Sequence, residues 1–213
     1  MINCTFCAAF TPGGDRAQWN QPLAETENFV VVPSLGSLVE GWLLMVPKDH
    51  YISMGALPPG LRIEADSLEQ RVMRSLRRRY AAPIVAFEHG PSAASHGTGC
   101  GVDHAHLHIV PTACDLLEYA RPLVPASVHW TVCDPSGEWD LRSAAYQAGQ
   151  DYLYLKGNCG PSVVATCEDF GSQIFRRALS RYLGIEDEYN WRTHARIDTV
   201  RRTVENLIAD LAA

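Results

Sequence analysis

The chain has 213 residues, of which 46% are hydrophobic and 20% charged, and its formal net charge is −6 at pH 7. That length suffices for one well-packed core, with or without a smaller appended unit. The acidic balance argues against a nucleic-acid backbone as the main partner, although backbone amides can hold a small phosphate ligand whatever the net charge.

The first residues and the cysteine content indicate the cellular compartment. The segment MINCTFCAAF has neither a basic start nor a long apolar run, so we expect no signal peptide, and we find no apolar stretch long enough for a membrane span. Seven cysteines are an odd number. Without an export signal this is typical of free thiols or a metal site in a reducing cytoplasm, where disulfides are rare. We therefore predict a cytoplasmic protein.

The first half of the chain predicts a loop followed by strands around one helix. Residues 1–20 are interrupted by Pro12-Gly13-Gly14 and read as a loop or short turn. Apolar and β-branched runs predict strands over 28–35, 41–50 and 83–90, the first two as an antiparallel pair. Apolar residues at a four-residue rhythm predict a helix over 60–80.

The second half predicts three more strands and two helices. The strands are expected over 129–133, 151–155 and 161–167, and the helices over 172–184 and 196–212. Gly184 is expected to cap the first of these helices. We place the boundary between two units at 1–115 and 116–213, with the second unit packing on the first or extending its sheet.

Three histidines alternate in the stretch DHAHLHIVP, residues 103–111. Alternate side chains of a strand share one face, so a strand over 103–110 gathers these on one side: His104, His106 and His108. The apolar residues between and after them would face the core: Ala105, Leu107 and Ile109. An imidazole can bind a metal, act as a base or attack as a nucleophile near neutral pH. We interpret the row as a functional site, because a solvated strand face would more often carry Lys, Glu, Thr or Ser.

Cys4 and Cys7 form a Cys-x-x-Cys pair near the start of the chain. Two thiolates at this spacing supply half of a tetrahedral zinc site. His50 and His104 stand at the ends of two predicted strands and can complete a Cys₂His₂ set if those strands lie close together. Four protein ligands would close the site, which makes the zinc structural. The alternatives are a redox pair, which a thioredoxin-like helix would normally follow, and two reduced buried thiols.

The run GCGVDHAHLHIVP resembles the signature of the histidine triad family, in which single apolar residues separate three histidines. ENFVVVPSLGSLVEGWLLMVPKDH, residues 27–50, resembles that family's paired strands, which end in Pro-Lys-x-His. An N-terminal Cys-x-x-Cys occurs in its zinc-containing branches, including relatives of galactose-1-phosphate uridylyltransferase. The resemblance covers residues 1–111. It implies an α+β fold with a central antiparallel sheet and flanking helices, to which the C-terminal half adds an α/β extension.

The resemblance also implies nucleotide chemistry. His106, the middle histidine, would attack the α-phosphorus of a nucleoside 5′-phosphate derivative, and water, phosphate or another acceptor would release the nucleotidyl-histidine. His108 would contact phosphate oxygens or assist the leaving group. His104 would contact phosphate or bind the zinc. Both a hydrolase and a nucleotidyltransferase are consistent with this pattern.

The loop ahead of the histidines departs from the family pattern. Gly99, Cys100 and Gly101 stand where relatives carry Gly-Gln-Ser/Thr, so the usual side-chain donors are lost. The backbone amides of this loop could still bind phosphate, because glycine allows a close approach.

Other candidate substrate-binding residues lie outside this loop. Glu88 and His89 occupy a segment where relatives carry Asn, and either would face the ribose or the phosphates. Gln173, at the start of the predicted helix over 172–184, could donate to a phosphate or a base. Arg177, or its neighbour Arg176, could neutralise a phosphate.

Two other functions compete with this one. The altered Cys100-Gly101 pair would suit a nucleotide-binding regulatory module with weak or lost catalysis, although such a module needs no nucleophile. Alternatively the three histidines hold a catalytic metal, which the lack of a nearby carboxylate ligand motif makes less favourable. As partners we expect a nucleotide but neither a nucleic acid nor a membrane. The resemblance also implies a homodimer formed through the long helix and a neighbouring strand.

Overall fold

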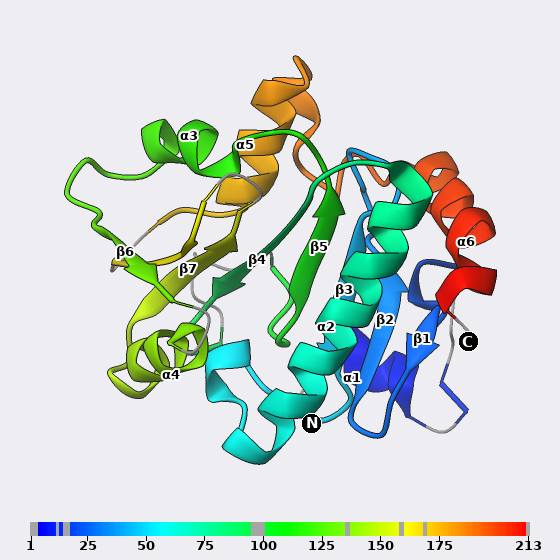
Figure 1. Cartoon of the computed structure of the whole chain (residues 1–213), viewed down its shortest axis with the longest axis horizontal. Helices are drawn as coiled ribbons and strands as arrows, with labels where there is room; N and C mark the ends of the chain where they lie inside the picture. Colours follow the sequence, from blue (N-terminus) through cyan, green and yellow to red (C-terminus); the bar gives the residue numbers. More distant parts are fainter. Residues whose placement is uncertain are drawn as a thin grey trace.

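The computed structural model describes residues 4–11, 13–14, 18–94, 101–134, 137–157, 160–167 and 170–211. In this part of the chain one antiparallel sheet of eight strands has the order β1-β2-β3-β5-β4-β7-β8-β6 (Figure 1). The strands are β1 (Ala24–Glu25), β2 (Phe29–Pro33), β3 (Leu43–Pro47), β4 (Ile84–Gly90), β5 (Leu107–Pro111), β6 (Trp130–Cys133), β7 (Asp151–Lys156) and β8 (Ser162–Cys167). The helices are α1 (Thr5–Phe10), α2 (Pro59–Tyr80), α3 (Leu116–Ala120), α4 (Glu138–Gln147), α5 (Ile174–Tyr182) and α6 (Ile197–Leu211).

Alternate side chains of the central strands enter cores on opposite faces of the sheet. Phe29 and Val31 of β2 pack with apolar residues of α2 and α6, whereas Val30 and Val32 pack with residues of α1. On the α1 face, toward the middle of the sheet, a further core joins the central strands to α3 and α5. The sheet therefore has α2, α4 and α6 on one face and α1, α3 and α5 on the other. The predicted α+β class, with a central antiparallel sheet and flanking helices, is confirmed.

Most predicted elements are present, with shifted ends. The long helix, all the predicted strands and the two C-terminal helices form, and Gly184 follows α5 with a φ of 69°. The structure adds α1 where a loop or short turn was expected, and it adds α3, α4 and the two-residue strand β1. None of the helices in the described part of the chain combines the length and apolar composition that crossing a bilayer requires.

The second half of the chain extends the sheet of the first half. β7 pairs with β4 from Ala86↔Lys156 to Gly90↔Tyr152, which makes the two halves one continuous sheet. Both large cores draw residues from both halves. Because β4 is bordered by β5 and β7, it offers no free edge on which a second copy could add a strand.

The histidine strand begins later than predicted. β5 starts at Leu107, and its pairing with β3 runs from Met45↔Leu107 to Leu43↔Ile109. His104 and His106 precede this strand, and His104 lies at a bend. The Ala105 amide donates to the Tyr51 carbonyl at 2.7 Å, outside the pairing of β5 with β3. The apolar residues next to the histidines are buried in the core beneath α2, as predicted: Ala105, Leu107 and Ile109.

Candidate active site and metal centre

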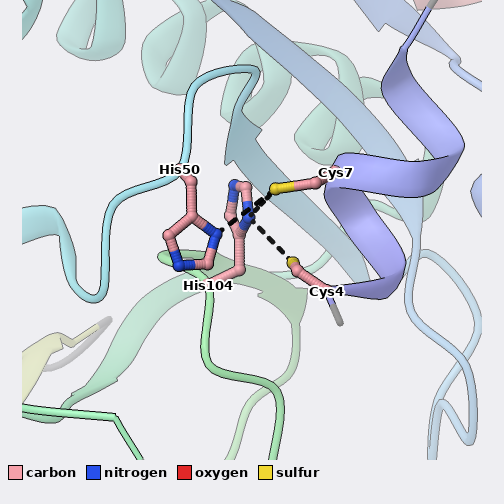
Figure 2. A group of neighbouring side chains, drawn as sticks. All are labelled: Cys4, Cys7, His50 and His104. Carbon is pink, nitrogen blue, oxygen red and sulfur yellow. Dashed lines mark hydrogen bonds between the residues drawn. The ribbon is translucent and has the colours of Figure 1, made fainter. Parts of the chain in front are cut away.

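Four sulfur and nitrogen donors meet where α1 packs against the end of β3 and the segment before β5 (Figure 2). Cys4 is the N-cap residue of α1, Cys7 lies in its first turn, His50 follows β3, and His104 precedes β5. Their ligand atoms all lie within 4.8 Å of one another. The Cys4 and Cys7 sulfurs are 3.3 and 3.6 Å from the His104 Nδ1, and the Cys7 sulfur is 3.3 Å from the His50 Nδ1.

The donor set fits a tetrahedral zinc ion. Ordinary Zn–S and Zn–N bond lengths at the tetrahedral angle place a sulfur and a nitrogen ligand about 3.6 Å apart. Three of the four sulfur–nitrogen distances of this group are 3.3, 3.3 and 3.6 Å. The chain can therefore supply two thiolates and two imidazoles to one ion, and these four residues close its coordination.

The tautomer of His104 also fits a metal ligand. Its Nε2 lies 2.8 Å from the carbonyl oxygen of Pro47, and a carbonyl can only accept, so the ring proton sits on Nε2. Nδ1 then turns its lone pair toward the two sulfurs, as a metal ligand with an oriented second nitrogen does. Burial, then the neighbouring Cys4 thiol, raises the pKa of Cys7 to about 11, so a metal must displace a proton to bind there.

His106 is held as a neutral imidazole with a defined tautomer. Its Nδ1 lies 2.7 Å from the carbonyl oxygen of His104, so Nδ1 carries the proton and Nε2 keeps its lone pair. The residue is 9% exposed and borders a cavity. Burial lowers the pKa of His106 below 6.5, which leaves the imidazole uncharged at neutral pH.

His108 is fixed in the opposite tautomer. The indole N–H of Trp42 donates to its Nδ1 at 2.9 Å, so the ring proton of neutral His108 sits on Nε2. Burial, followed by the nearby His106, His89 and Arg176, holds the pKa of His108 well below 6.5. The centroids of the His106 and His108 rings are 4.9 Å apart. Two neighbouring rings therefore differ in their protons: Nε2 of His106 keeps a lone pair, and Nε2 of His108 carries a hydrogen.

The cavity beside these rings has a volume of about 160 Å³ and lies on the α1 face of the sheet. Its polar wall includes His106, His108, Arg176, Ser34 and Asn20. Its apolar wall includes Phe6, Trp19, Leu35, Leu44, Val102 and Trp191. Such a wall, largely apolar with a few convergent polar groups, is typical of a small-molecule site.

Glu88 and His89, the two predicted substrate-binding residues of β4, point to opposite faces of the sheet because side chains alternate along a strand. His89 is buried on the His108 side, where its Nε2 accepts the Phe175 amide at 3.2 Å and its ring centroid is 6.2 Å from that of His108. Glu88 points to the other face and accepts hydrogen bonds from the Met54 amide and the Tyr152 hydroxyl. The assignment of Glu88 to the substrate is therefore corrected, because the sheet lies between its carboxylate and the cavity.

The remaining predicted substrate residues have different surroundings. Gly101 has a φ of 80°, and its carbonyl accepts a hydrogen bond from the Arg192 guanidinium at 3.0 Å. Gln173 is buried at the start of α5, and its Oε1 has no hydrogen-bond partner among the described residues. Arg177 is half-buried over the Tyr189 ring, whereas its neighbour Arg176 borders the cavity. The other two predicted residues of the loop before the histidines, at positions 99 and 100, lie outside the described residues.

Three aromatic residues of the site were not predicted from the sequence. Phe6 lies between the two cysteines of the metal group, and its ring centroid is 5.6 Å from that of His104 and 6.1 Å from that of His106. Trp42 orients His108, and Trp19 forms part of the apolar wall. Of these, Trp42 carried a usable signal, since an indole on a buried strand needs an acceptor for its N–H.

No protein-family model and no curated protein sequence matches the chain. Among solved structures, a Zn-bound histidine triad family protein from Mycobacterium smegmatis is 24% identical over 70% of this chain and 93% of its own, with a TM-score of 0.42. A hypothetical histidine triad nucleotide-binding protein from Sulfolobus tokodaii is 22% identical over 51% and 68%, with a TM-score of 0.41. Yeast Ap4A phosphorylase in complex with AMP is 11% identical over 66% and 56%, with a TM-score of 0.39. Each of these likenesses is partial in both sequence and structure.

Proposed function

We propose that the chain is a nucleotide hydrolase or nucleotidyltransferase that forms a covalent nucleotidyl intermediate on His106. The observation that carries this is the hydrogen bond from His106 Nδ1 to the His104 carbonyl, which leaves Nε2 unprotonated at the cavity wall. Support from the sequence is the histidine signature of residues 104–110. The substrate would be a nucleoside 5′-phosphate derivative.

The proposed reaction has two steps. The Nε2 lone pair of His106 forms a bond to the α-phosphorus while the bond from phosphorus to the leaving group breaks, and the leaving group keeps that electron pair. The Nε2–H of His108 can donate to an oxygen of the phosphoryl group as its charge grows. Water, or another acceptor, then attacks phosphorus. The N–P bond breaks, its electron pair returns to Nε2, and the acceptor's proton passes to solvent.

Zinc has a structural part in this proposal. Cys4, Cys7, His50 and His104 would hold it, and the bound ion would supply the charge that keeps both thiols ionised. The chain's own residues do the rest. His104 gives its carbonyl to His106 and its Nδ1 to the metal group, so the backbone that orients the nucleophile is tied to α1.

Intact-protein mass spectrometry after brief mixing tests the covalent step. The panel is ADP, ATP, dinucleoside polyphosphates, nucleotide sugars and an adenosine phosphoramidate, with His106→Ala treated in parallel. We expect a mass gain of one nucleotidyl group that is absent from the variant. If no adduct forms and turnover persists in His106→Ala, the assignment of His106 as the nucleophile is wrong. Binding without turnover would favour the regulatory-module alternative.

The pH dependence of kcat/KM is a second test of His106. Its pKa lies below 6.5 in the folded protein because burial disfavours the imidazolium. An imidazole is neutral above its pKa, so a lowered pKa extends the active form toward acid. We expect kcat/KM to stay level as pH falls from about 8 to 6.5 and to decline only below that. Zinc content is measured at each pH, and a decline centred at or above pH 6.5 would contradict the assignment.

Substituting Trp42 with Phe tests the tautomer of His108. Losing the indole N–H removes the donor that holds the proton on Nε2, so we expect kcat to fall roughly tenfold to a hundredfold. Nitrogen-15 NMR of the His108 ring should show the tautomer shift that packing loss alone would not produce. Trp139→Phe is the matched control, since that indole donates to Asp66 on the other face of the sheet. An unchanged tautomer in Trp42→Phe would refute this role.

A further inference from the structure

A buried arginine from the C-terminal half borders the same cavity as the catalytic histidines. Arg176, in the first turn of α5, is 1% exposed and forms part of the wall that contains His106 and His108. We infer that Arg176 binds a second phosphate group of the nucleotide, distinct from the phosphoryl group that His106 attacks. This inference rests on the proposed function, because it assumes that the cavity receives a nucleotide.

The contacts of Arg176 fix its guanidinium in place. Its Nε donates to the Tyr189 carbonyl at 2.9 Å, one Nη donates to the Gly36 carbonyl, and its guanidinium carbon lies 4.7 Å from the centroid of the Trp42 ring. A guanidinium carries five N–H donors in a planar fork, so it can hold backbone carbonyls on one side and phosphate oxygens on another. Its orientation is set before any ligand arrives, which reduces the entropy lost on binding.

The C-terminal half also closes the cavity around this arginine. Trp191 contributes to the wall, and it packs so closely on Gly36 that a Cβ at this glycine would lie 2.5 Å from the Trp191 Cβ. The Gly36 amide donates to the Ala195 carbonyl at 2.8 Å. The segment after α5 is thus docked on the loop between β2 and β3, and Arg176 bonds to the same loop.

The contacts between neighbouring side chains place Arg176 next to Trp42 and not next to His106. They run from His106 to His108, from His108 to Trp42, and from Trp42 to Arg176. His106 must touch the α-phosphorus, and Arg176 stands on the far side of His108 and Trp42 in this order, within the same cavity wall. We assign to Arg176 the part of the ligand next to the attacked phosphoryl group. Guanidinium pairs best with phosphate or carboxylate, and a nucleotide carries phosphate. The second phosphate can belong to the 5′ chain or to the ribose.

Calorimetric titration of the full chain distinguishes these sources. The ligands are AMP, the noncleavable α,β-methylene analogue of ADP, and adenosine 3′,5′-bisphosphate, together with the corresponding guanosine, cytidine and uridine compounds. We expect the wild type to bind one of the two-phosphate ligands at least about tenfold more tightly than the monophosphate. Preference for the methylene analogue assigns the phosphate to the 5′ chain, and preference for the bisphosphate assigns it to the ribose.

In Arg176→Gln the preferred two-phosphate ligand and the monophosphate should bind with nearly equal affinity. In Arg176→Lys the ratio of these two affinities should fall at least about threefold, because lysine lacks the planar fork of N–H donors. The ratio within one protein cancels general damage to the cavity. Arg181→Gln is the matched control, since Arg181 is an exposed residue of the same helix that pairs with Glu186. If the glutamine variant fails to fold, the lysine variant decides. An unchanged ratio, or a wild type without preference, overturns the inference. Turnover that persists in His106→Ala and gives no adduct refutes the proposed function separately.

Discussion

His106→Ala is expected to lower kcat/KM by about 10⁴-fold or more, the scale on which removal of a catalytic nucleophile acts. The alanine variant keeps the cavity and the metal group but has no atom that can bond to phosphorus. The KM should change little, because other wall residues, among them His108 and Arg176, stay in place. Steady-state kinetics on the substrate that gives the highest yield of adduct check this expectation.

The matched control is His129→Ala. His129 is an exposed histidine next to the edge strand β6, so its loss removes an imidazole without altering the cavity. Activity of the control should equal that of the wild type. A loss of less than about tenfold in His106→Ala would move the nucleophile elsewhere, because general acid–base effects alone account for larger losses than that.

Removing the metal is expected to destabilise the fold and to lower activity. Purified protein should hold about one zinc ion per chain. A ligand whose free concentration is about a thousand times its Kd adds about 4 kcal/mol to the free energy of unfolding. Losing that contribution in a chain of this size lowers Tm by roughly 10 °C. Thermal melts before and after dialysis against a chelator, with zinc measured by mass spectrometry, test this result.

Cys4→Ser should reproduce the effect of the chelator, because a neutral hydroxyl replaces one of the thiolate ligands. Cys167→Ser is the control, a half-buried cysteine of β8 that lies outside the metal group. Equal zinc content in Cys4→Ser and the wild type would show that the ion, if bound, sits elsewhere. Zinc should also be lost more readily in acid, since the ligands must shed protons to bind it.

The local chemistry of the site could be predicted from the sequence better than its long-range geometry. The Cys-x-x-Cys spacing and the histidines at the ends of two predicted strands indicated the group that meets in the fold, because each ligand stands next to a recognisable element. The pairing of β4 with β7 could not be predicted, since nothing local in either strand specifies a partner more than sixty residues away.

Single-residue errors in the site have a common cause. Whether Glu88 or His89 points to the face of the sheet that carries the cavity depends on the phase of β4, and both positions lie in a strand that is buried throughout. The choice between Arg176 and Arg177 depends on the rotation of α5 about its axis, which packing against β4 and the β2–β3 loop decides. Sequence periodicity places such residues on an element but does not fix which of two neighbours points inward.

Helix α1 is six residues long, and a helix of that length has no stability of its own in water. Yet the helix and its N-cap residue supply two of the proposed metal ligands, Cys7 and Cys4, and its Thr5 and Phe6 form part of the cavity wall. Zinc and nucleotide would therefore share the entropic cost of ordering one segment, and each would make the other's binding tighter by the same factor. In that case a cell's supply of zinc would set how strongly the protein holds its nucleotide, and a bound nucleotide would slow the escape of the metal.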